Sequence, residues 1–429
     1  MVRDMPHDAP AVTVVGLNYP PEPTGISPYT GAMARGLAER GFHVRAITAH
    51  PHYPEWRVSA GYGQWSRNEL LSGVHVHRVR HYVPRPPTGI RRLLSEVTFG
   101  LRAAFAQWGK PDAIVFISPA MFSSCIAMVR ARVLHRRTPT VVWVQDLYSL
   151  GLSETGQGSG IVTSITKRAE GWLLRRADKV VVIHDRFARR VIEDFHLQPE
   201  RVEVIRNWTH LPPSPDIDRE QARRERGWGD ETVVLHAGNM GVKQGLDNVI
   251  AAAQLADHRR SNVRFVLLGS GSERDRLRAA AAGLERIEFV DSLPDDKFVA
   301  TLTAADILLV NELPGVAEMA VPSKLTSYFA AGRPVLAATD PTGITAEEVQ
   351  LADAGIVVPA GDPLALLDGI ERIAAAPLQA ETHGKNGKRY RETVLAETHA
   401  LDRFDSLLTK LATAAERRPL LAQAPQTGD

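Results

Sequence analysis

Glycine-rich stretches in the second half of the chain have the composition of phosphate-binding loops. The run Gly238–Gly245 separates an apolar stretch from an amphipathic one and carries Lys243. The run Gly269–Glu273 stands at a second junction of the same kind. Glycines let backbone N–H groups approach an anion at the start of a helix, and a lysine adds charge. Tight turns between strand and helix would also explain both runs. Neither run alone is therefore specific evidence for phosphate binding.

The segment 318–334 is more informative because it places a lysine where a helix begins. Ser323 suits a helix N-cap, Lys324 falls in the first turn, and Gly332 ends the helix before the next strand. A lysine in a first turn opposes the helix dipole and costs roughly a few tenths of a kcal/mol. A bound anion would remove that cost, so the position favours a diphosphate partner. Glu318, a few residues earlier, is placed to accept hydrogen bonds from sugar hydroxyls.

A third candidate loop follows the first apolar stretch of the chain. The segment Gly16–Ile26 holds three prolines and Gly25, and Ser27 and Pro28 suit the N-cap and first position of a helix. Such a loop can present backbone amides to an anion. A rigid turn between strand and helix is the alternative, and we favour the interpretation as a ligand-facing loop.

Composition excludes several classes of protein. The 429 residues are 44% apolar and 23% charged, which is typical of folded globular proteins. The one cysteine, Cys125, excludes an internal disulfide framework and a cysteine-rich zinc site. No segment reaches the roughly 18 apolar residues of a spanning helix, and the start lacks the apolar stretch of a signal peptide. We therefore expect a cytoplasmic protein.

The net charge of +2 hides an asymmetry between the halves. Residues 1–210 hold 27 Lys and Arg against 17 Asp and Glu, which is a net +10, and the remainder holds 24 against 32, a net −8. A basic half indicates an anionic partner such as a phosphate or an acidic membrane surface. A scattered surplus of solvated charges would give the same count.

Apolar runs alternate with longer amphipathic segments, which predicts βαβ units and buried parallel sheets. The thirteen expected strands are 12–16, 43–48, 74–79, 113–118, 140–145, 179–183, 202–205, 232–238, 263–269, 287–290, 307–311, 334–338 and 355–358. Thirteen strands are too many for one doubly wound sheet. The sequence therefore predicts an α/β protein with two Rossmann-like domains facing each other across a cleft, with ligands at the carboxyl ends of the strands.

The expected domain boundaries follow composition. Residues 1–210 would form the first domain, the proline-rich and charged stretch 211–226 the linker, and 227–386 the second domain. Helices in 387–414 would brace the first domain, and residues 415–429 would be a disordered tail. Asp216 and Asp218 superficially match a metal-binding Asp-x-Asp pair but fall in the expected linker.

The ordered set of these motifs resembles glycosyltransferase family 4 of the GT-B enzymes. Its elements are Gly-Asn-Met-Gly-x-Lys-Gln-Gly at 238–245, Gly-Ser-Gly-Ser-Glu at 269–273, and Pro-Ser-Lys-Leu followed by Ala-Ala-Gly-Arg-Pro at 322–334. Two segments near the start of the chain, residues 18–26 and 51–56, are similar to the WbuB-type branch of this family. Members of that branch build O-antigen, colanic acid and related envelope polysaccharides. The resemblance runs from about residue 12 to 408.

The resemblance implies a retaining, metal-independent transfer from a nucleotide-sugar donor, UDP-linked by our expectation, to a polyprenyl-diphosphate-linked saccharide. The transferred unit would be a hexose, an N-acetylated amino sugar or a deoxy sugar, and neither a cofactor nor nucleic acid is implied. Roles carry over by position. The diphosphate would be held by Gly25, Lys243, Ser323 and Lys324, the nucleoside would be flanked by Gly269 and Gly271, with Asn239 and Leu325 beside the donor, and Glu318 would bind the donor sugar.

Three positions depart from the family pattern. Asn239 stands where many relatives have arginine, and Gln244 separates Lys243 from the following glycine. Ser327 replaces the second of two glutamates eight residues apart. A histidine near the end of the fifth strand is absent, and the run there ends in Asp146. Asp146 is our candidate for orienting or deprotonating the acceptor, with a buried capping role as the alternative.

The segment Arg91–Trp108 spaces large apolar residues at three and four with arginines between them, which suits a helix in a bilayer interface. Packing on the sheet explains the same pattern. Peripheral attachment would use this helix and a basic group formed by Arg130, Arg132, Arg136 and Arg137. Three other functions stay open: transfer to a soluble acceptor such as an inositol derivative, a GT-B-fold nucleotide-sugar 2-epimerase, and an inactive binding partner.

Overall fold

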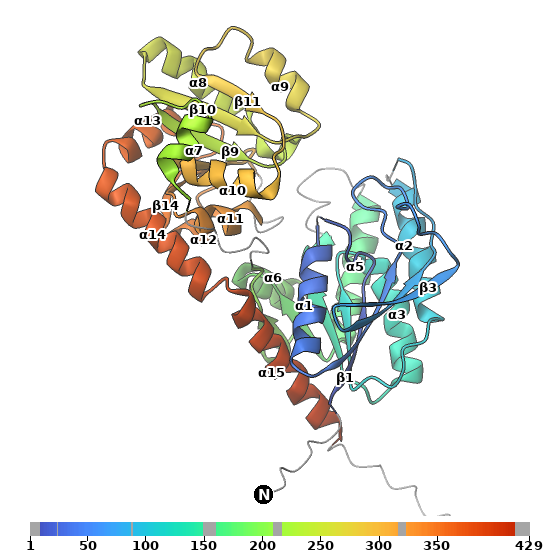
Figure 1. Cartoon of the computed structure of the whole chain (residues 1–429). Coiled ribbons are helices and arrows are strands. Elements are labelled where there is room, and N and C mark those ends of the chain that lie inside the picture. The colour runs from blue at the N-terminus through green and yellow to red at the C-terminus, as the bar shows by residue number, and fades with distance from the viewer. Residues whose placement is uncertain are drawn as a thin grey trace, which may run out of the picture. The chain divides into compact units, whose positions relative to one another are not determined.

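The computed structural model describes residues 9–23, 25–86, 89–148, 160–208, 217–315 and 323–416. The chain divides into two compact units, drawn together in Figure 1. The first unit runs to Ile205 and takes up the chain again from Ala400. The second unit runs from Arg206 to His399. None of the helices in these ranges is long and apolar enough to cross a bilayer.

The first unit is built on an eight-stranded sheet in the order β3-β4-β2-β1-β5-β6-β7-β8. Every neighbouring pair is parallel except β3 and β4. The strands are β1 (Ala11–Val15), β2 (His43–Ala49), β3 (Ser66–Leu71), β4 (Val74–Val79), β5 (Ala113–Ile117), β6 (Thr140–Val144), β7 (Lys179–Val182) and β8 (Val202–Val204). The central strands β5 and β6 are buried at every residue, as expected for a sheet covered on both faces.

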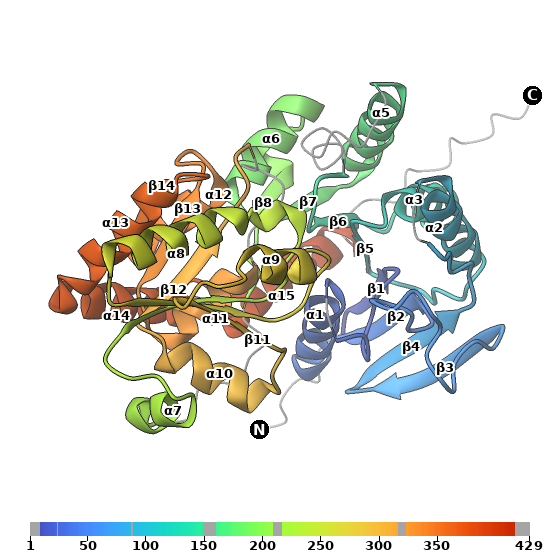
Figure 2. The ribbon, with the colours of Figure 1, turned by 90° about the horizontal axis from the view of Figure 1, so that it is seen from above.

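Strand β3 is absent from the sequence prediction. It pairs antiparallel with β4 as a hairpin at the edge of the sheet, which Figure 2 shows plainly. Its residues Ser66–Leu71 alternate between exposed and half-buried, so they form no apolar run. An edge strand with one solvated face therefore gives a weaker sequence signal than the buried parallel strands.

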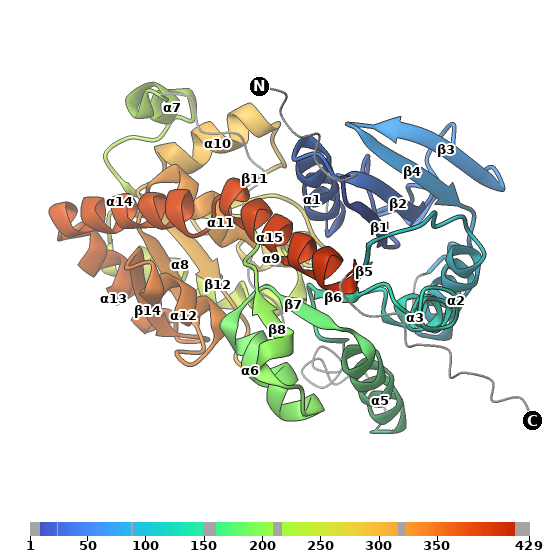
Figure 3. The same cartoon turned by 90° about the horizontal axis from the view of Figure 1, so that it is seen from below.

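The helices that connect strands of the first unit are α1 (Ser27–Glu39), α2 (Gly89–Ala104), α3 (Met121–Leu134), α5 (Gly160–Arg176) and α6 (Asp185–Phe195). The C-terminal helix α15 (Glu397–Glu416) is the last element that the structure describes. Helices α2 and α3 lie side by side in Figures 2 and 3 and pack closely, with the Cα of Ser123 only 2.8 Å from where a Cβ on Gly100 would lie. A larger residue at Gly100 would push the two helices apart.

Helix α15 packs on the first unit. Phe404 is fully buried and meets the ring of Trp143 edge-on at 4.9 Å between centroids. Leu401 fills the space that a side chain at Gly36 would need, and Arg40 donates to Asp402 at 2.7 Å. The end of the chain that the structure describes is thus held on the first sheet. Residues 417–429 of the expected disordered tail lie outside the described ranges.

The second unit is built on a six-stranded parallel sheet in the order β11-β10-β9-β12-β13-β14. The strands are β9 (Thr232–Ala237), β10 (Val263–Leu268), β11 (Ile287–Val290), β12 (Ile307–Asn311), β13 (Val335–Thr339) and β14 (Gly355–Pro359). Alternate residues of one strand serve two cores. Val234 belongs to one buried cluster, and its neighbours Val233 and Leu235 belong to the other, because successive side chains of a strand point to opposite faces.

Helices cover both faces of this sheet. One core includes residues of α8 (Asp247–Arg259), α9 (Arg274–Ala280) and α13 (Pro363–Ala374). The other includes residues of α7 (Arg219–Glu225), α10 (Asp295–Ala304), α11 (Ser323–Ala331), α12 (Ile344–Leu351) and α14 (Pro377–Thr393). The result is a doubly wound α/β layer structure, with the loops after β9, β10, β12 and β13 at the carboxyl edge.

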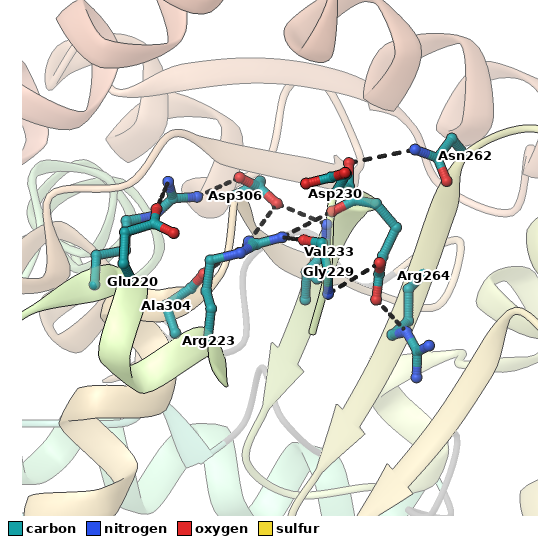
Figure 4. A network of polar contacts seen from close by, with 11 residues as sticks. Glu220, Arg223, Gly229, Asp230, Val233, Asn262, Arg264, Ala304 and Asp306 are labelled. Carbon is teal, nitrogen blue, oxygen red and sulfur yellow. Dashed lines mark hydrogen bonds and ion pairs between the residues drawn. The ribbon is translucent and has the colours of Figure 1, made fainter. Parts of the chain in front are cut away.

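The charged half of the expected linker forms helix α7 instead. Arg223 is nearly buried and donates to Asp306 at 2.9 Å and to the carbonyls of Ala304 and Gly229 at 3.1 and 2.6 Å (Figure 4). Asp306 also accepts from the backbone N–H of Val233 at 2.8 Å. This network ties α7 to the start of β9, so residues 219–225 belong to the second unit and not to a linker. Residues 209–216 lie outside the described ranges.

Candidate functional site

Two loops at the carboxyl edge of the second sheet form the floor of the candidate site. The first loop follows β9 and contains the short 3-10 helix η2 (Val242–Gln244). Asn311, at the end of β12, donates to the carbonyls of Gln244 and Gly245 at 2.8 and 3.0 Å and accepts from Asn248 at 2.9 Å. A fully buried amide therefore fixes the loop that carries Lys243 against the neighbouring strand.

The second loop, after β10, packs on the first loop backbone to backbone. The N–H of Met240 donates to Ser270 at 2.8 Å, and the carbonyl of Met240 accepts from Glu273 at 2.9 Å. A Cβ on Gly269 would lie 2.1 Å from the carbonyl oxygen of Gly238, and both glycines have positive φ. Only glycine permits this approach, so these positions are explained by loop packing whether or not a ligand is bound.

Lys324 is the charged group of this site. It lies in the first turn of α11, as predicted, and is partly buried, with its Cε 3.9 Å from the position of a Cβ on Gly238. Its Nζ is 3.5 Å from Nε2 of His236 on β9. The structure therefore brings together the lysine from one predicted motif and the glycine loop from another.

The surroundings of Lys324 disfavour its charge. Burial lowers the pKa of Lys324 to about 8, although the nearby Glu312 acts in the opposite direction. Burial, with the charge of Lys324, also holds the pKa of His236 well below its usual value, so His236 is neutral. A buried cation without a full counter-charge is the arrangement that an incoming anion stabilises.

Glu312 and Tyr328 complete the frame around the lysine. Glu312 accepts hydrogen bonds from the hydroxyls of Thr339 and Thr345, the second at 2.6 Å, and burial raises its pKa. Tyr328 is fully buried, and its hydroxyl accepts from the N–H of Ala237 at 2.8 Å. That contact fixes the end of β9 immediately before the glycine loop.

The other predicted donor-site residues of this unit differ in exposure and position. Asn239 and Lys243 are exposed on the first loop, and the carbonyl of Lys243 accepts from the N–H of Leu313 at 2.8 Å. Leu325 is 2% exposed and packs in the core, so its side chain is not available to a ligand. Ser323 is the first residue of α11 and not the residue before it, which corrects the predicted N-cap.

Glu318, the predicted sugar-binding residue, lies outside the described residues. Two groups beside Lys324 escaped the sequence analysis, His236 and Glu312. A histidine inside an apolar run two residues before a glycine loop is a signal that could have identified His236. Glu312 directly follows a buried strand, which is where ligand-facing side chains of such sheets stand.

In the first unit, Glu22 fixes the loop that carries Gly25. One carboxylate oxygen accepts from the N–H groups of His52 and Tyr53 at 2.8 and 3.0 Å, and the other accepts from Asn18 at 2.8 Å. Burial by itself raises the pKa of Glu22, but the hydrogen bonds from His52 and Asn18 outweigh it and lower the pKa. Gly25 has a φ of 68°, and a Cβ there would meet the Tyr53 ring at 3.3 Å.

Helix α1 and Asp146 also lie at the carboxyl edge of the first sheet. The N-cap of α1 is Ile26 and its first residue is Ser27, so Ser27 does not cap the helix as predicted. Asp146 follows β6, is half-buried, and its carbonyl accepts from the Ser118 hydroxyl at 3.4 Å. Among the residues that the structure describes, no three His, Cys, Asp or Glu side chains gather closely enough to hold a metal ion.

The two doubly wound sheets and the lysine-bearing edge of the second one define a protein of the GT-B glycosyltransferase class. Residues 24–208 match the Glycosyl transferase 4-like domain, and residues 231–376 match the Glycosyl transferases group 1 domain. The chain belongs to glycosyltransferase family 4, which confirms the resemblance drawn from the motifs.

Three proteins illustrate the similarity. WcaI of Escherichia coli K12, named for colanic acid biosynthesis, is 33% identical over 337 residues, which are 75% of this chain and 81% of WcaI. A D-inositol 3-phosphate glycosyltransferase of Catenulispora acidiphila is 27% identical over 392 residues, 84% of this chain and 86% of that protein. The structure of Anabaena HepE in complex with UDP-glucose has a TM-score of 0.66 at 16% identity and covers 93% of this chain and 99% of HepE.

Proposed function

We propose that this glycosyltransferase transfers a sugar from a UDP-linked donor, with retention and without a metal ion, to a lipid-linked saccharide in envelope polysaccharide synthesis. The observation that carries the donor site is Lys324, a partly buried lysine in the first turn of α11 beside the loop after β9. The relation to WcaI supports the envelope pathway, and the fold shared with HepE in its UDP-glucose complex supports the UDP donor.

The chemistry explains why a lysine belongs at this point. When the bond between sugar and nucleoside diphosphate breaks, negative charge develops on the leaving phosphate. Lys324 and the N–H groups at the start of α11 would stabilise that charge as it forms, and Lys243 would add to it from the exposed loop. Removing one such group typically lowers the rate about 10²- to 10³-fold.

A lipid-linked acceptor requires access to a membrane surface, and helix α2 offers one. Its exposed residues Ile90, Leu94 and Leu101 fall on one stripe with Phe105, within about 60° of one another around the helix axis. Phe105 is 86% exposed. Phe99, on the opposite face, is buried and would not contact a bilayer. The stripe fits peripheral attachment to the cytoplasmic face of a membrane.

The basic group predicted to assist this attachment is smaller than the sequence indicated. Arg130 donates to the carbonyls of Ala104 and Ala106, and Arg132 pairs with Asp178 at 3.2 Å. These two arginines therefore serve the packing of the first unit. Arg136 and Arg137 are exposed, and in this proposal they are the basic residues that assist membrane attachment.

Donor binding is the first experiment. Thermal unfolding of the purified protein would be followed with UDP, GDP, TDP and CDP, for the native chain, Lys324→Ala and Lys297→Ala. Lys297 is an exposed lysine of α10 and serves as the matched control. A ligand at 100 times its Kd should add about 2.7 kcal/mol. We expect stabilisation by UDP that survives in Lys297→Ala and disappears in Lys324→Ala, and no response to any diphosphate would refute the donor assignment.

Product analysis tests the remaining parts of the proposal. The anomeric configuration of the product, read by proton NMR, decides between retention and inversion, and activity that persists in EDTA supports a metal-independent reaction. Incubation of the UDP-sugar without acceptor would reveal an epimerase by the appearance of a second UDP-sugar. Transfer to inositol phosphate and not to a lipid-linked sugar would favour a soluble acceptor.

Membrane attachment has its own control within the chain. Cosedimentation with vesicles that contain phosphatidylglycerol should fall in Phe105→Glu and stay unchanged in Leu378→Glu. Leu378 is 80% exposed on α14 of the second unit. Equal binding of both variants would contradict the role of the α2 stripe.

A further inference from the structure

The first unit contains a cavity that the donor site does not use. Its volume is about 630 Å³, and it lies between the residues after β4 and helix α2. Trp65, Tyr82 and Leu101 form part of an apolar wall, and Trp65 and Leu101 are 69% and 48% exposed, so that wall extends to the surface. Cavities of roughly 300–1,000 Å³ are typical of sites for small organic ligands.

The charge of the lining is one-sided. Arg80 and Arg102 line the cavity, and no Asp or Glu does. Arg80 is exposed, and its guanidinium has no hydrogen bond or ion pair with any residue in the described ranges. Arg102 lies over the ring of Trp65, 3.7 Å from its centroid, and its buried Nε has no partner among the described residues. Both arginines therefore retain donors for an anion.

A buried imidazole marks the deep side of the cavity. His50 is 1% exposed, and its Nε2 lies 2.9 Å from the carbonyl of Gln64. Burial lowers the pKa of His50, so the ring is neutral and Nε2 donates to that carbonyl. Its Nδ1 is then an acceptor, and it has no partner in the part of the chain that the structure describes. A buried acceptor of this kind calls for a hydroxyl or another donor.

We propose that this cavity binds a lipid-linked sugar and holds the phosphate that joins the lipid chain to the sugar. The phosphate lies against Arg80 and Arg102, the first carbons of the chain lie over Trp65 and Leu101, and a sugar hydroxyl donates to Nδ1 of His50. The inference rests on the proposed function, because it names the part of the first unit that holds the lipid-linked acceptor.

The position of the cavity beside the α2 stripe supports this order of groups. Leu101 belongs both to the cavity wall and to the exposed stripe with Leu94 and Phe105. A chain that leaves the cavity across Leu101 therefore stays on apolar surface. The unpartnered donors of Arg80 and Arg102 line the same cavity as Leu101 and the buried His50, so a phosphate held by them would join chain and sugar within one cavity.

Calorimetric titration of the full chain would use three soluble ligands: glucosyl farnesyl diphosphate, farnesyl diphosphate and glucose 1-phosphate. The variants are Arg80→Gln and Leu101→Glu, with the exposed Lys110→Gln as the matched control. We expect glucosyl farnesyl diphosphate to bind most tightly. Arg80→Gln should weaken both farnesyl ligands about five- to tenfold, and Leu101→Glu should weaken them more, with no change in Lys110→Gln.

Equal affinities for glucose 1-phosphate and the farnesyl ligands would overturn the role of the apolar wall, and an unchanged affinity in Arg80→Gln would overturn the phosphate site. Equal binding with and without the glucosyl group would overturn the place of the sugar beside His50. UDP is titrated into the same samples. UDP binding without lipid binding would refute this inference alone, whereas lipid binding without UDP binding would refute the donor site and leave the cavity assignment standing.

Discussion

Replacing Lys324 by methionine should make the ligand-free protein more stable and should abolish nucleotide binding. Burial lowers the pKa of Lys324 from 10.5 to about 8, so the folded state disfavours the charged lysine by about 3 kcal/mol at neutral pH. Methionine is of similar length and carries no charge, so it fills the same space without that cost.

Two contacts reduce the expected gain. Nζ of Lys324 lies 3.5 Å from Nε2 of His236, and the variant leaves this buried nitrogen without a donor. Glu312 loses a nearby positive charge. Each loss costs on the order of 1 kcal/mol, so the net gain is about 1–2 kcal/mol. For a domain of roughly 150–250 residues that corresponds to a rise of about 2–8 °C in the Tm of the second unit.

The pH dependence separates this cause from general packing effects. The pKa of Lys324 is lower in the folded state than in the unfolded state, so its cost is complete below pH 8 and disappears between about pH 8 and 10.5. The difference in Tm between Lys324→Met and the native chain should therefore shrink over this range in a scanning calorimetry series, with Lys297→Met as control. A variant that is no more stable than the native chain at pH 7 would refute the reasoning.

Three further changes test how the second unit is assembled. Tyr328→Phe removes the acceptor of a buried strand N–H, and urea unfolding should show a loss of about 1–3 kcal/mol. Gly271→Ala places a Cβ 2.3 Å from a backbone oxygen and should abolish UDP binding in a thermal-shift assay, whereas Gly283→Ala has open space around it and should preserve binding. Arg223→Ala breaks a nearly buried ion pair and should cost about 3–5 kcal/mol in urea unfolding, against little change for the exposed Arg224→Ala.

The sequence predicted the fold well wherever strands are buried on both faces. All thirteen expected strands are present, because a buried parallel strand is almost entirely apolar: β5 is apolar at each position, and β6 at each position after Thr140. Elements whose burial depends on a few residues leave no such pattern in the sequence. Strand β3 alternates at a sheet edge, and α7 is held by Arg223, a charged residue that becomes buried only because Asp306 and three carbonyls meet it.

The candidate site was predictable where local chemistry is unusual and not where packing brings distant residues together. Lys324 was identifiable because a lysine in a first turn conflicts with the helix dipole. His236 and Glu312 lie near Lys324 only because the fold brings the ends of β9 and β12 and the start of α11 to the same edge of the sheet. A local sequence pattern does not contain that information. Ser323 was misplaced by one residue because helix starts are uncertain at that scale.

The glycines and the lysine of the second unit therefore carry different weight as evidence of function. Gly269 and Gly271 are required by the contact between the two loops, since a Cβ at either position would overlap a backbone oxygen. Their presence would be necessary even in a protein that binds nothing. Lys324 has no such structural justification, because burial disfavours its charge and helix α11 would be more stable without it. A residue that lowers stability and stands beside a glycine loop would be explained by an anion bound there, which is why the proposed donor site depends on Lys324.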